Sequence, residues 1–361
     1  MILARSPYII DINEPSQEAT RLELFLWNGT GSAPATPTYS LSKKVPSINN
    51  LRTYYNIAPF IREFFDFTQS SPIGTTNAIA NQYSYCNVQF KRYYTLDGVE
   101  TLINTVTDKA FDGFGYFNDG NNYGGQFVFL SNLSYYGGLN TYYYDCNGDA
   151  GTLTMNAFNL TTLFWRVKYT NLRTGVTQIV SITDDRIALV EKVYTGWEND
   201  GNKLEIYTTS VGIPPNITNY GTYYFVPKCE CRYDVITCDF VNRWGSWQRE
   251  FFYKASNETL EMTNNQFKLN PTVFPIYQVD EGQVKTFNTN GKTTIKTNTG
   301  WVEENYKQVV EEIMLSEVIR INGQPATIKT KSVEKYKHIN QKTINYQLEF
   351  DLAFDVINSV S

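Results

Sequence analysis

Apolar and polar residues alternate along several short segments of the chain, which is the pattern of half-buried strands. In Thr343–Leu352, Ile, Tyr, Leu, Phe and Leu occupy every second position. In Ala19–Trp27, three leucines alternate with Arg21, Glu23 and the bulky Phe25. We expect further strands at Ser6–Asn13, Tyr39–Val45, Leu163–Tyr169, Thr177–Ile182, Lys203–Thr208, Thr222–Val226, Thr293–Thr297, Leu315–Ile321, Ala326–Lys331, and within Gln82–Leu130.

Turn-forming residues separate these segments. Asp97-Gly98 predicts a turn, and Asn322-Gly323 is a strong hairpin signal, because Asn, Asp and Gly tolerate a positive φ. Asn171–Gly175 predicts another hairpin, and Val211–Tyr220, with its two prolines, predicts a loop. An aromatic hairpin is expected in Cys238–Tyr253, where Asn, Arg, Trp, Gly and Ser at 242–246 separate two short strands.

Two segments have a helical period instead. In Asn56–Phe67 apolar residues recur at i, i+3, i+4 and i+7, and Asn56 could cap the helix. The second helix is predicted at residues 300–314 with Thr299 as its cap. Its apolar residues run from Trp301 to Ile313, with charged residues, Glu312 among them, mostly on the opposite side.

A change in composition after Pro227 divides the chain into two expected domains. The first, residues 1–226, carries a Gly/Asn/Tyr-rich inserted region at about residues 70–160. The second, residues 227–361, carries the aromatic hairpin and the 300–314 helix. The sequence therefore predicts a mainly β protein of two β-sandwich-like domains, each with a short amphipathic helix packed on a sheet.

Composition narrows the class of protein. The chain has 361 residues, of which 27 are Tyr, 22 Phe and 6 Trp, and its net charge is −5. A chain of this charge without a basic patch is not expected to bind nucleic acid, since such binding requires phosphate neutralisation. Its first residues lack a secretory leader and no segment reaches the apolar length of a membrane span. We therefore expect a soluble protein made in a cytoplasm.

Residues capable of catalysis or metal binding are few. His338, the single histidine, lies among lysines, and no nucleophile motif accompanies it. Cys229, Cys231 and Cys238 could supply three thiolates to a metal, but small apolar packing explains them better. Asp145–Gly151 lacks the glycine and the glutamate of a calcium loop, which favours a turn. We expect no enzyme activity, no cofactor and no metal.

Three parts of the sequence resemble virion tail proteins of bacteriophages that infect Bacteroidota, including the crAss-like group. The segments that carry this resemblance are Ser6–Ile10 with Glu23–Asn28 and Tyr55–Arg62, then Phe240–Gln248, and finally Ile344–Phe350 with Asn358–Val360. The resemblance implies a structural subunit of a tail ring, hub, baseplate or fibre adaptor. Its partners would be other copies in a ring and neighbouring tail or fibre proteins. It would assemble in the bacterial host cytoplasm and remain in the virion tail.

Two sets of residues are candidates for this function. Arg243 and Trp244 are the interface candidates, since Arg and Trp are enriched among residues that dominate binding energy. Trp247 is instead expected to pack inside the protein. The alternative function is a receptor- or glycan-binding module of the tail tip. The aromatic residues that could face a glycan are Tyr116, Phe117, Tyr123, Tyr135 and Tyr136.

A third, weaker alternative is a tail-associated glycosidase. Asp184 and Asp185 could form part of its carboxylate pair, although a loop tip between two strands explains them better.

Overall fold

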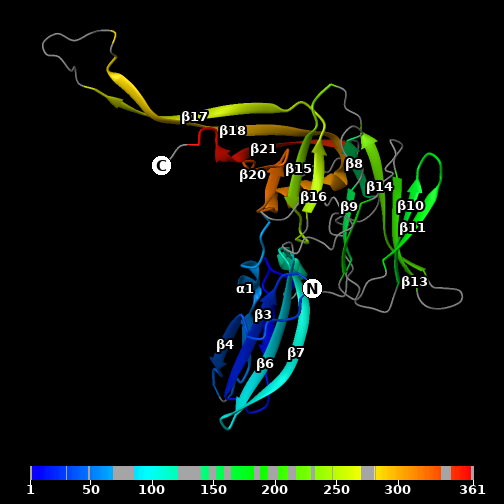
Figure 1. Ribbon diagram of the computed structural model, residues 1–361, viewed down its shortest axis with the longest axis vertical. Helices are drawn as coiled ribbons and strands as arrows, with labels where there is room; N and C mark the ends of the chain where they lie inside the picture. Colours follow the sequence, from blue (N-terminus) through cyan, green and yellow to red (C-terminus); the bar gives the residue numbers. More distant parts are fainter. Residues whose placement is uncertain are drawn as a thin grey trace. The chain divides into compact units, whose positions relative to one another are not determined.

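The computed structural model describes most of the chain and confirms the mainly β class (Figure 1). The described residues are 2–29, 31–47, 49–67, 85–120, 140–145, 152–157, 164–182, 188–193, 202–209, 217–228, 232–245, 247–269, 280, 282–334 and 343–358. The chain forms two compact units. The first comprises Met1–Cys229 and Phe240–Glu250, and the second comprises Glu230–Asp239 and Phe251–Ser361. The boundary expected after residue 226 stays a prediction.

The first unit begins with a five-stranded sheet in the order β1-β7-β6-β3-β4 (Figure 1). Its strands are β1 Ile2–Leu3, β3 Ala19–Trp27, β4 Tyr39–Lys44, β6 Tyr85–Leu96 and β7 Val99–Phe111. A separate two-stranded pair joins β2 Ile9–Ile12 to β5 Thr53–Asn56. The short helix α1 spans Ala58–Arg62, and its Ile61 belongs to the same buried cluster as residues of β2, β3 and β6.

Alternation along β3 determines which face meets this core. Leu22 and Leu24 are fully buried in the cluster. On the opposite face the ammonium of Lys91 lies 4.7 Å from the centre of the Phe25 ring, which is itself buried. α1 spans only Ala58–Arg62 and is therefore shorter than the expected Asn56–Phe67. Its N-cap is Ile57, so the expected capping role of Asn56 is wrong, although the Ala58 N–H donates to Asn56 Oδ1 at 3.3 Å.

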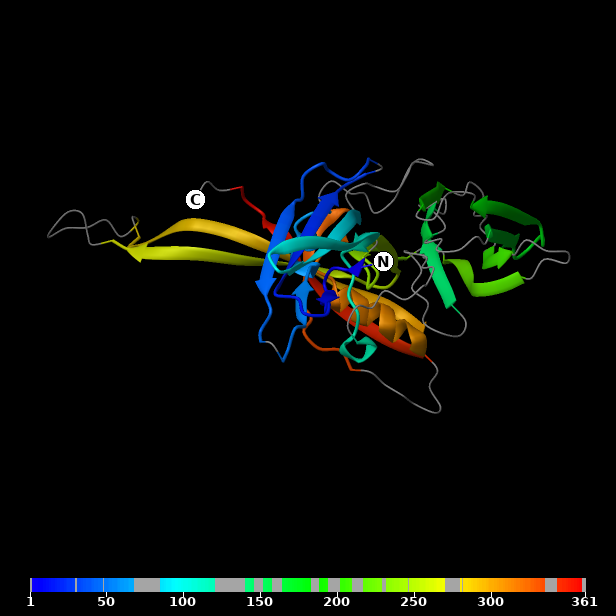
Figure 2. The same ribbon diagram turned by 90° about the horizontal axis from the view of Figure 1, so that it is seen from below.

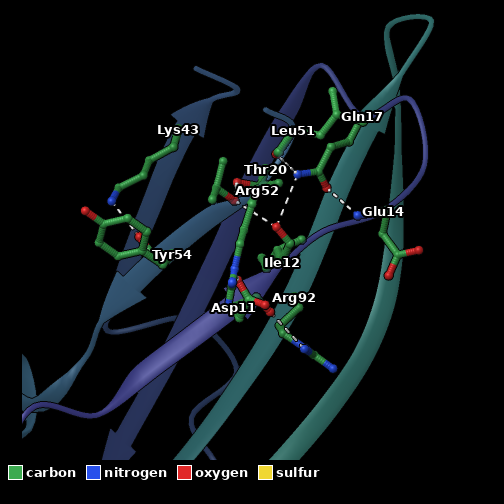
Figure 3. A network of polar contacts seen from close by, with 11 residues as sticks. Asp11, Ile12, Glu14, Gln17, Thr20, Lys43, Leu51, Arg52, Tyr54 and Arg92 are labelled. Carbon is green, nitrogen blue, oxygen red and sulfur yellow. Dashed lines mark hydrogen bonds and ion pairs between the residues drawn. The ribbon is translucent and has the colours of Figure 1, made fainter. Parts of the chain in front are cut away.

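A buried glutamine connects the segments around this sheet (Figure 3). Gln17 is 1% exposed. Its amide nitrogen donates to the carbonyls of Ile12, at 3.2 Å, and of Leu51, while its oxygen accepts the Glu14 N–H at 3.0 Å. Thr20 lies nearby. A single buried side chain thus bonds three backbone groups, of which the Ile12 carbonyl also accepts the Thr53 hydroxyl at 3.5 Å.

The remaining strands of the first unit form two further sheets. One has the order β11-β10-β13-β14-β8 and the other pairs β12 with β9. Their bounds are β8 Asn140–Asp145, β9 Thr152–Ala157, β10 Phe164–Asn171, β11 Thr177–Ile182, β12 Ala188–Val193, β13 Asn202–Thr209 and β14 Ile217–Lys228. The predicted hairpin around Asn171–Gly175 is confirmed, whereas the predicted loop Val211–Tyr220 is wrong from Ile217 onward, where β14 begins.

The second unit is built on a seven-stranded sheet with the order β16-β15-β19-β20-β21-β18-β17. Its elements are β15 Ile236–Val241, β16 Trp247–Phe252, β17 Asn257–Lys268, β18 Val284–Glu303, α2 Lys307–Leu315, β19 Ile319–Ile321, β20 Gln324–Ile328 and β21 Thr343–Asp355. The alternation in β21 is confirmed, since Tyr346, Leu348 and Phe350 are buried on its core face. Phe240–Glu250, which includes the end of β15, the turn and most of β16, groups with the first unit.

The predicted start of the second helix is wrong. Thr299 is not a cap, because β18 continues through it to Glu303 and α2 begins at Lys307. A bulge at Asn298–Trp301, with Gly300 at φ +68°, allows the strand to continue. Trp301 is 61% exposed on this strand, whereas Glu312, expected on the polar side, is buried.

The predicted turn at Asp97-Gly98 and the predicted hairpin at Asn322-Gly323 are both confirmed, each as a two-residue connection. Asp97 and Gly98 have φ values of +50° and +76° between β6 and β7. Asn322 and Gly323 have φ values of +49° and +79° between β19 and β20. These are the left-handed conformations that Asn, Asp and Gly adopt at low cost.

Candidate functional site

The first candidate surface joins two turns of the first unit, residues 112–119 and residues 242–245. The Phe114 N–H donates to the carbonyl of Arg243 at 2.8 Å. A Cβ on Gly113 would lie 2.5 Å from that carbonyl oxygen, and a Cβ on Gly245 would lie 2.6 Å from the Asp112 nitrogen. The backbones therefore approach so closely that only glycine fits at both positions.

Buried polar side chains hold the 242–245 turn. Asn242 is fully buried, and its side-chain oxygen accepts the Trp244 N–H at 3.0 Å. Its amide nitrogen donates to Gln248 Oε1 at 3.2 Å, and Gln248 donates in turn to Glu250 Oε1 at 2.7 Å. The positive φ that the turn requires falls on Gly245, at +78°. Asn242 thus contributes hydrogen bonds while Gly245 contributes the unusual backbone conformation.

Arg243 connects the two turns electrostatically. Its guanidinium forms an ion pair with the carboxylate of Asp119. It also lies 4.5 Å from the centre of the Tyr116 ring and 4.7 Å from that of Trp244. The side chain is only 17% exposed, so solvent screens the ion pair less than it would at the open surface. Arg243 therefore has a clear role inside the chain, and its role as an interface residue stays a prediction.

One aromatic residue is held away from these contacts. Phe117 is 99% exposed in the short 3-10 turn Phe117–Asp119. That turn is fixed because the Tyr116 N–H donates to Asp119 Oδ2 at 2.8 Å and the Asp119 N–H donates to the Tyr116 carbonyl at 2.9 Å. An anchored turn that presents a phenylalanine to solvent can offer a ring to a ligand with little loss of conformational entropy.

The other aromatic candidates differ in their exposure and in their neighbours. Trp244 is half-buried beside Arg243. Trp247 is 5% exposed and packs edge-on against Phe67, with ring centres 5.8 Å apart, so the expected packing role is confirmed. The structure therefore brings Tyr116, Phe117, Arg243 and Trp244 to one place. Tyr123, Tyr135 and Tyr136 lie outside the described residues.

The second candidate surface is the two-stranded ribbon of β17 and β18, which we call the arm: residues 257–268 and 284–296. Figures 1 and 2 show this ribbon extending beyond the other strands of its sheet. All twelve residues of β17 are exposed. Five large apolar side chains of the arm, on both strands, are exposed as well. They are Leu260 at 54%, Met262 at 66%, Phe267 at 43%, Val284 at 57% and Phe287 at 46%.

The register of the sheet shows that one face of the arm continues the hydrophobic core. Glu258 pairs with Ile295, and Ile295 pairs with the buried Phe350, so these residues share a face. Leu260 and Met262 follow Glu258 at every second position and lie on that same face. The apolar surface therefore extends from the core along the arm and into solvent.

The opposite face of the arm is charged. Lys329 Nζ lies 2.8 Å from Glu261 Oε1 and 3.7 Å from Asp351 Oδ1. The hydrogen bond to Glu261, supported by the field of nearby carboxylates, raises the pKa of Lys329. Lys292 lies 3.7 Å from Asp351 on this face as well. Near the sheet the arm is thus amphipathic: charged side chains pair on one face, whereas Leu260 and Met262 on the other face stay more than half exposed among the described residues. Farther out, Phe267 and Phe287 lie on the same face as Glu261, with ring centres 5.5 Å apart.

Sequence reasoning missed the arm. Asn257–Lys268 contains mostly Asn, Thr, Gln and charged residues, and only Leu260, Met262 and Phe267 are large and apolar. A strand with both faces in solvent has no need to alternate, so its periodicity is weak. The one usable indication was two Thr/Asn/Lys-rich segments on either side of a proline-containing connection.

Metal and membrane sites find no support in the described part of the chain. Among those residues no group of three or more His, Cys, Asp or Glu could hold a metal ion. Cys238 is fully buried, while Cys229, Cys231, Asp184 and Asp185 lie outside the described residues. Over the same residues, no helix combines the length and apolarity needed to cross a membrane.

Comparison with known proteins finds no match for this chain among family models, curated proteins or solved structures.

Proposed function

We propose that the chain is a structural subunit of a bacteriophage tail, in a ring, hub, baseplate or fibre adaptor, that acts by assembling with other copies and neighbouring tail proteins. The resemblance of its opening, its aromatic hairpin and its last strand to such proteins motivates the proposal. The observation that carries the assembly role is the arm. Leu260 and Met262 extend the core face of the sheet along it and stay more than half exposed among the described residues.

The energetics of the arm favour association. Fully burying a Leu, Met, Val or Phe side chain contributes about 1.5–3 kcal/mol. The arm leaves five such side chains roughly half exposed, so several kcal/mol become available only when another surface covers them. Aromatic residues are enriched at protein interfaces, and the composition is rich in tyrosine. These features favour an assembled protein over an isolated monomer.

Locating the chain in the particle tests this function. Antibodies against the purified chain are expected to decorate the tails of intact phage particles, and quantitative mass spectrometry should give a fixed copy number per particle. An antibody against the major capsid protein serves as the control and should decorate heads only. Absence of the chain from purified particles would rule the proposal out.

A second candidate function is binding of a host-surface glycan, for which Phe117 is the supporting observation. A ring that is 99% exposed on an anchored turn can stack on the apolar face of a sugar. We expect Phe117→Ala to weaken binding of host-surface polysaccharide about tenfold, because burial of a phenylalanine is worth more than 1.4 kcal/mol. Calorimetric titration measures this effect.

Tyr54→Ala is the matched control, since Tyr54 is 60% exposed on β5 and should leave polysaccharide binding unchanged. If the wild-type chain binds no polysaccharide but occurs at a fixed copy number in tails, the glycan function is excluded and the structural one stands.

A further inference from the structure

The outer edge of the arm is a strand with one free side. In the described residues β17 forms a ladder with β18 alone and is the last strand of its sheet. The bulge in this ribbon lies on β18, where the register shifts opposite Thr263–Asn265 and Asn288 has φ +51°. β17 continues as one strand over its twelve residues, although Asn264 has no partner in the register with β18. A long edge strand of this kind presents unpaired N–H and C=O groups that can pair with another chain.

The charges of β17 indicate what can pair there. Its charged residues are Glu258, Glu261 and Lys268. Glu261 is already paired with Lys329 on the polar face. Glu258 and Lys268, in contrast, form no ion pair with any described residue. A partner strand that sets a cation opposite Glu258 and a carboxylate opposite Lys268 would satisfy both.

A second copy of β17 meets this condition in one register. Two identical antiparallel strands related by a two-fold axis must have one residue facing itself. When Thr263 occupies that position, Glu258 of each copy faces Lys268 of the other, because both lie five residues from Thr263. Centring the pair on Glu261 would oppose like charges, and centring it on Met262 or Asn264 would leave both charges unmatched.

The same register makes the uncharged pairs favourable. Thr263 faces Thr263, and threonine pairs across strands are stabilising. Glu261 faces Asn265, which can donate to it. Met262 of one copy lies diagonally from Met262 of the other, within reach of a long side chain. Contact there would cover part of the apolar face that is exposed in the single chain.

We propose that β17 pairs edge to edge and antiparallel with β17 of a second copy, across a two-fold axis at Thr263. This deepens the assembly function and rests on it. The contact joins copies in pairs, whereas a ring of more than two copies needs head-to-tail contacts made by other surfaces. The arm therefore links two copies that need not be neighbours within one ring.

Charge reversal in the full chain tests the register. Glu258→Lys and Lys268→Glu, made separately, each place like charges opposite one another twice per pair. Each is expected to raise the dissociation constant of the pair by about tenfold or more, measured by sedimentation velocity. The two single variants mixed in equal amounts should associate with wild-type affinity, because each then supplies the charge that the other lacks. The double variant E258K/K268E should also associate normally.

Lys285→Glu is the matched control. Lys285 lies on β18, opposite Phe267, and is therefore not on the outer edge of β17 that is proposed to pair. Its dissociation constant should equal that of the wild type. Loss of association in the singles without recovery in the mixture would overturn the two-fold register, as would equal effects of Lys285→Glu and Lys268→Glu.

A disulfide provides an independent test. Facing residues in antiparallel strands have Cα atoms about 4.5–5.5 Å apart, within the range of a disulfide. Thr263→Cys should therefore form a covalent dimer under mild oxidation, and mass spectrometry should find the 263–263 linked peptide. Thr259→Cys, on the same face, should not, since position 259 faces 267. A monomeric Thr263→Cys chain would overturn the arm contact, while detection of the chain in tails would leave the structural function intact.

Discussion

Gly245→Ala is expected to lower the free energy of unfolding by about 3 kcal/mol. A non-glycine residue at φ +78° costs about 1–2 kcal/mol. In addition, the new Cβ would lie 2.6 Å from the Asp112 nitrogen and 2.8 Å from the Asp112 carbonyl carbon. These are backbone atoms, so the two turns must separate to admit the methyl group. Urea unfolding followed by tryptophan fluorescence measures the change, since Trp244 adjoins the substituted residue.

Gly323→Ala separates the two causes. Gly323 has φ +79°, but a Cβ there would meet no atom within 4 Å. It should therefore cost only the conformational part, about 1–2 kcal/mol. Equal losses in the two variants would mean that the close approach of the turns contributes nothing to stability.

Gln17→Leu is expected to destabilise the first unit by about 2 kcal/mol. Leucine is of similar size, but it cannot bond the carbonyls of Ile12 and Leu51 or the N–H of Glu14. Each buried polar group that is left without its partner costs about 1–3 kcal/mol. Figure 3 shows that the amide of Gln17 is directed at these groups. Urea unfolding again measures the loss.

Gln89→Leu is the corresponding control. Its amide donates to Thr107 Oγ1 at 3.0 Å on the exposed side of the sheet, where water can replace the bond. Its cost should stay below about 0.5 kcal/mol. If Gln17→Leu is no more harmful than Gln89→Leu, the network around Gln17 is not what fixes the segments that it joins.

Local patterns predicted much of the fold. The leucines of β3 and the alternating residues of β21 identify half-buried strands, because one face of each meets a core and the other meets water. Asp97-Gly98 and Asn322-Gly323 identify hairpins through the backbone conformations that they permit. In each case the determining physics lies within a few residues of the pattern.

Other features depended on distant residues and could not be predicted in this way. Thr299 matches a helix cap locally, but its hydroxyl accepts the Tyr346 N–H at 3.0 Å within the sheet. Tyr116 was predicted as an aromatic residue that could face a glycan, and Arg243 was predicted separately as an interface residue. The ion pair that links their turns joins positions 124 residues apart, which no local pattern indicates.

The composition of the first unit has a consequence for synthesis on the ribosome. That unit is completed by residues 240–250, although its turn at residues 112–119 is translated much earlier. At about 5–20 residues per second, translation of the intervening chain takes on the order of ten seconds. During that interval the nascent turn lacks Arg243 and the backbone of Gly245. The first unit therefore cannot finish folding before the second has begun to emerge, and no single cleavage between them yields two complete halves.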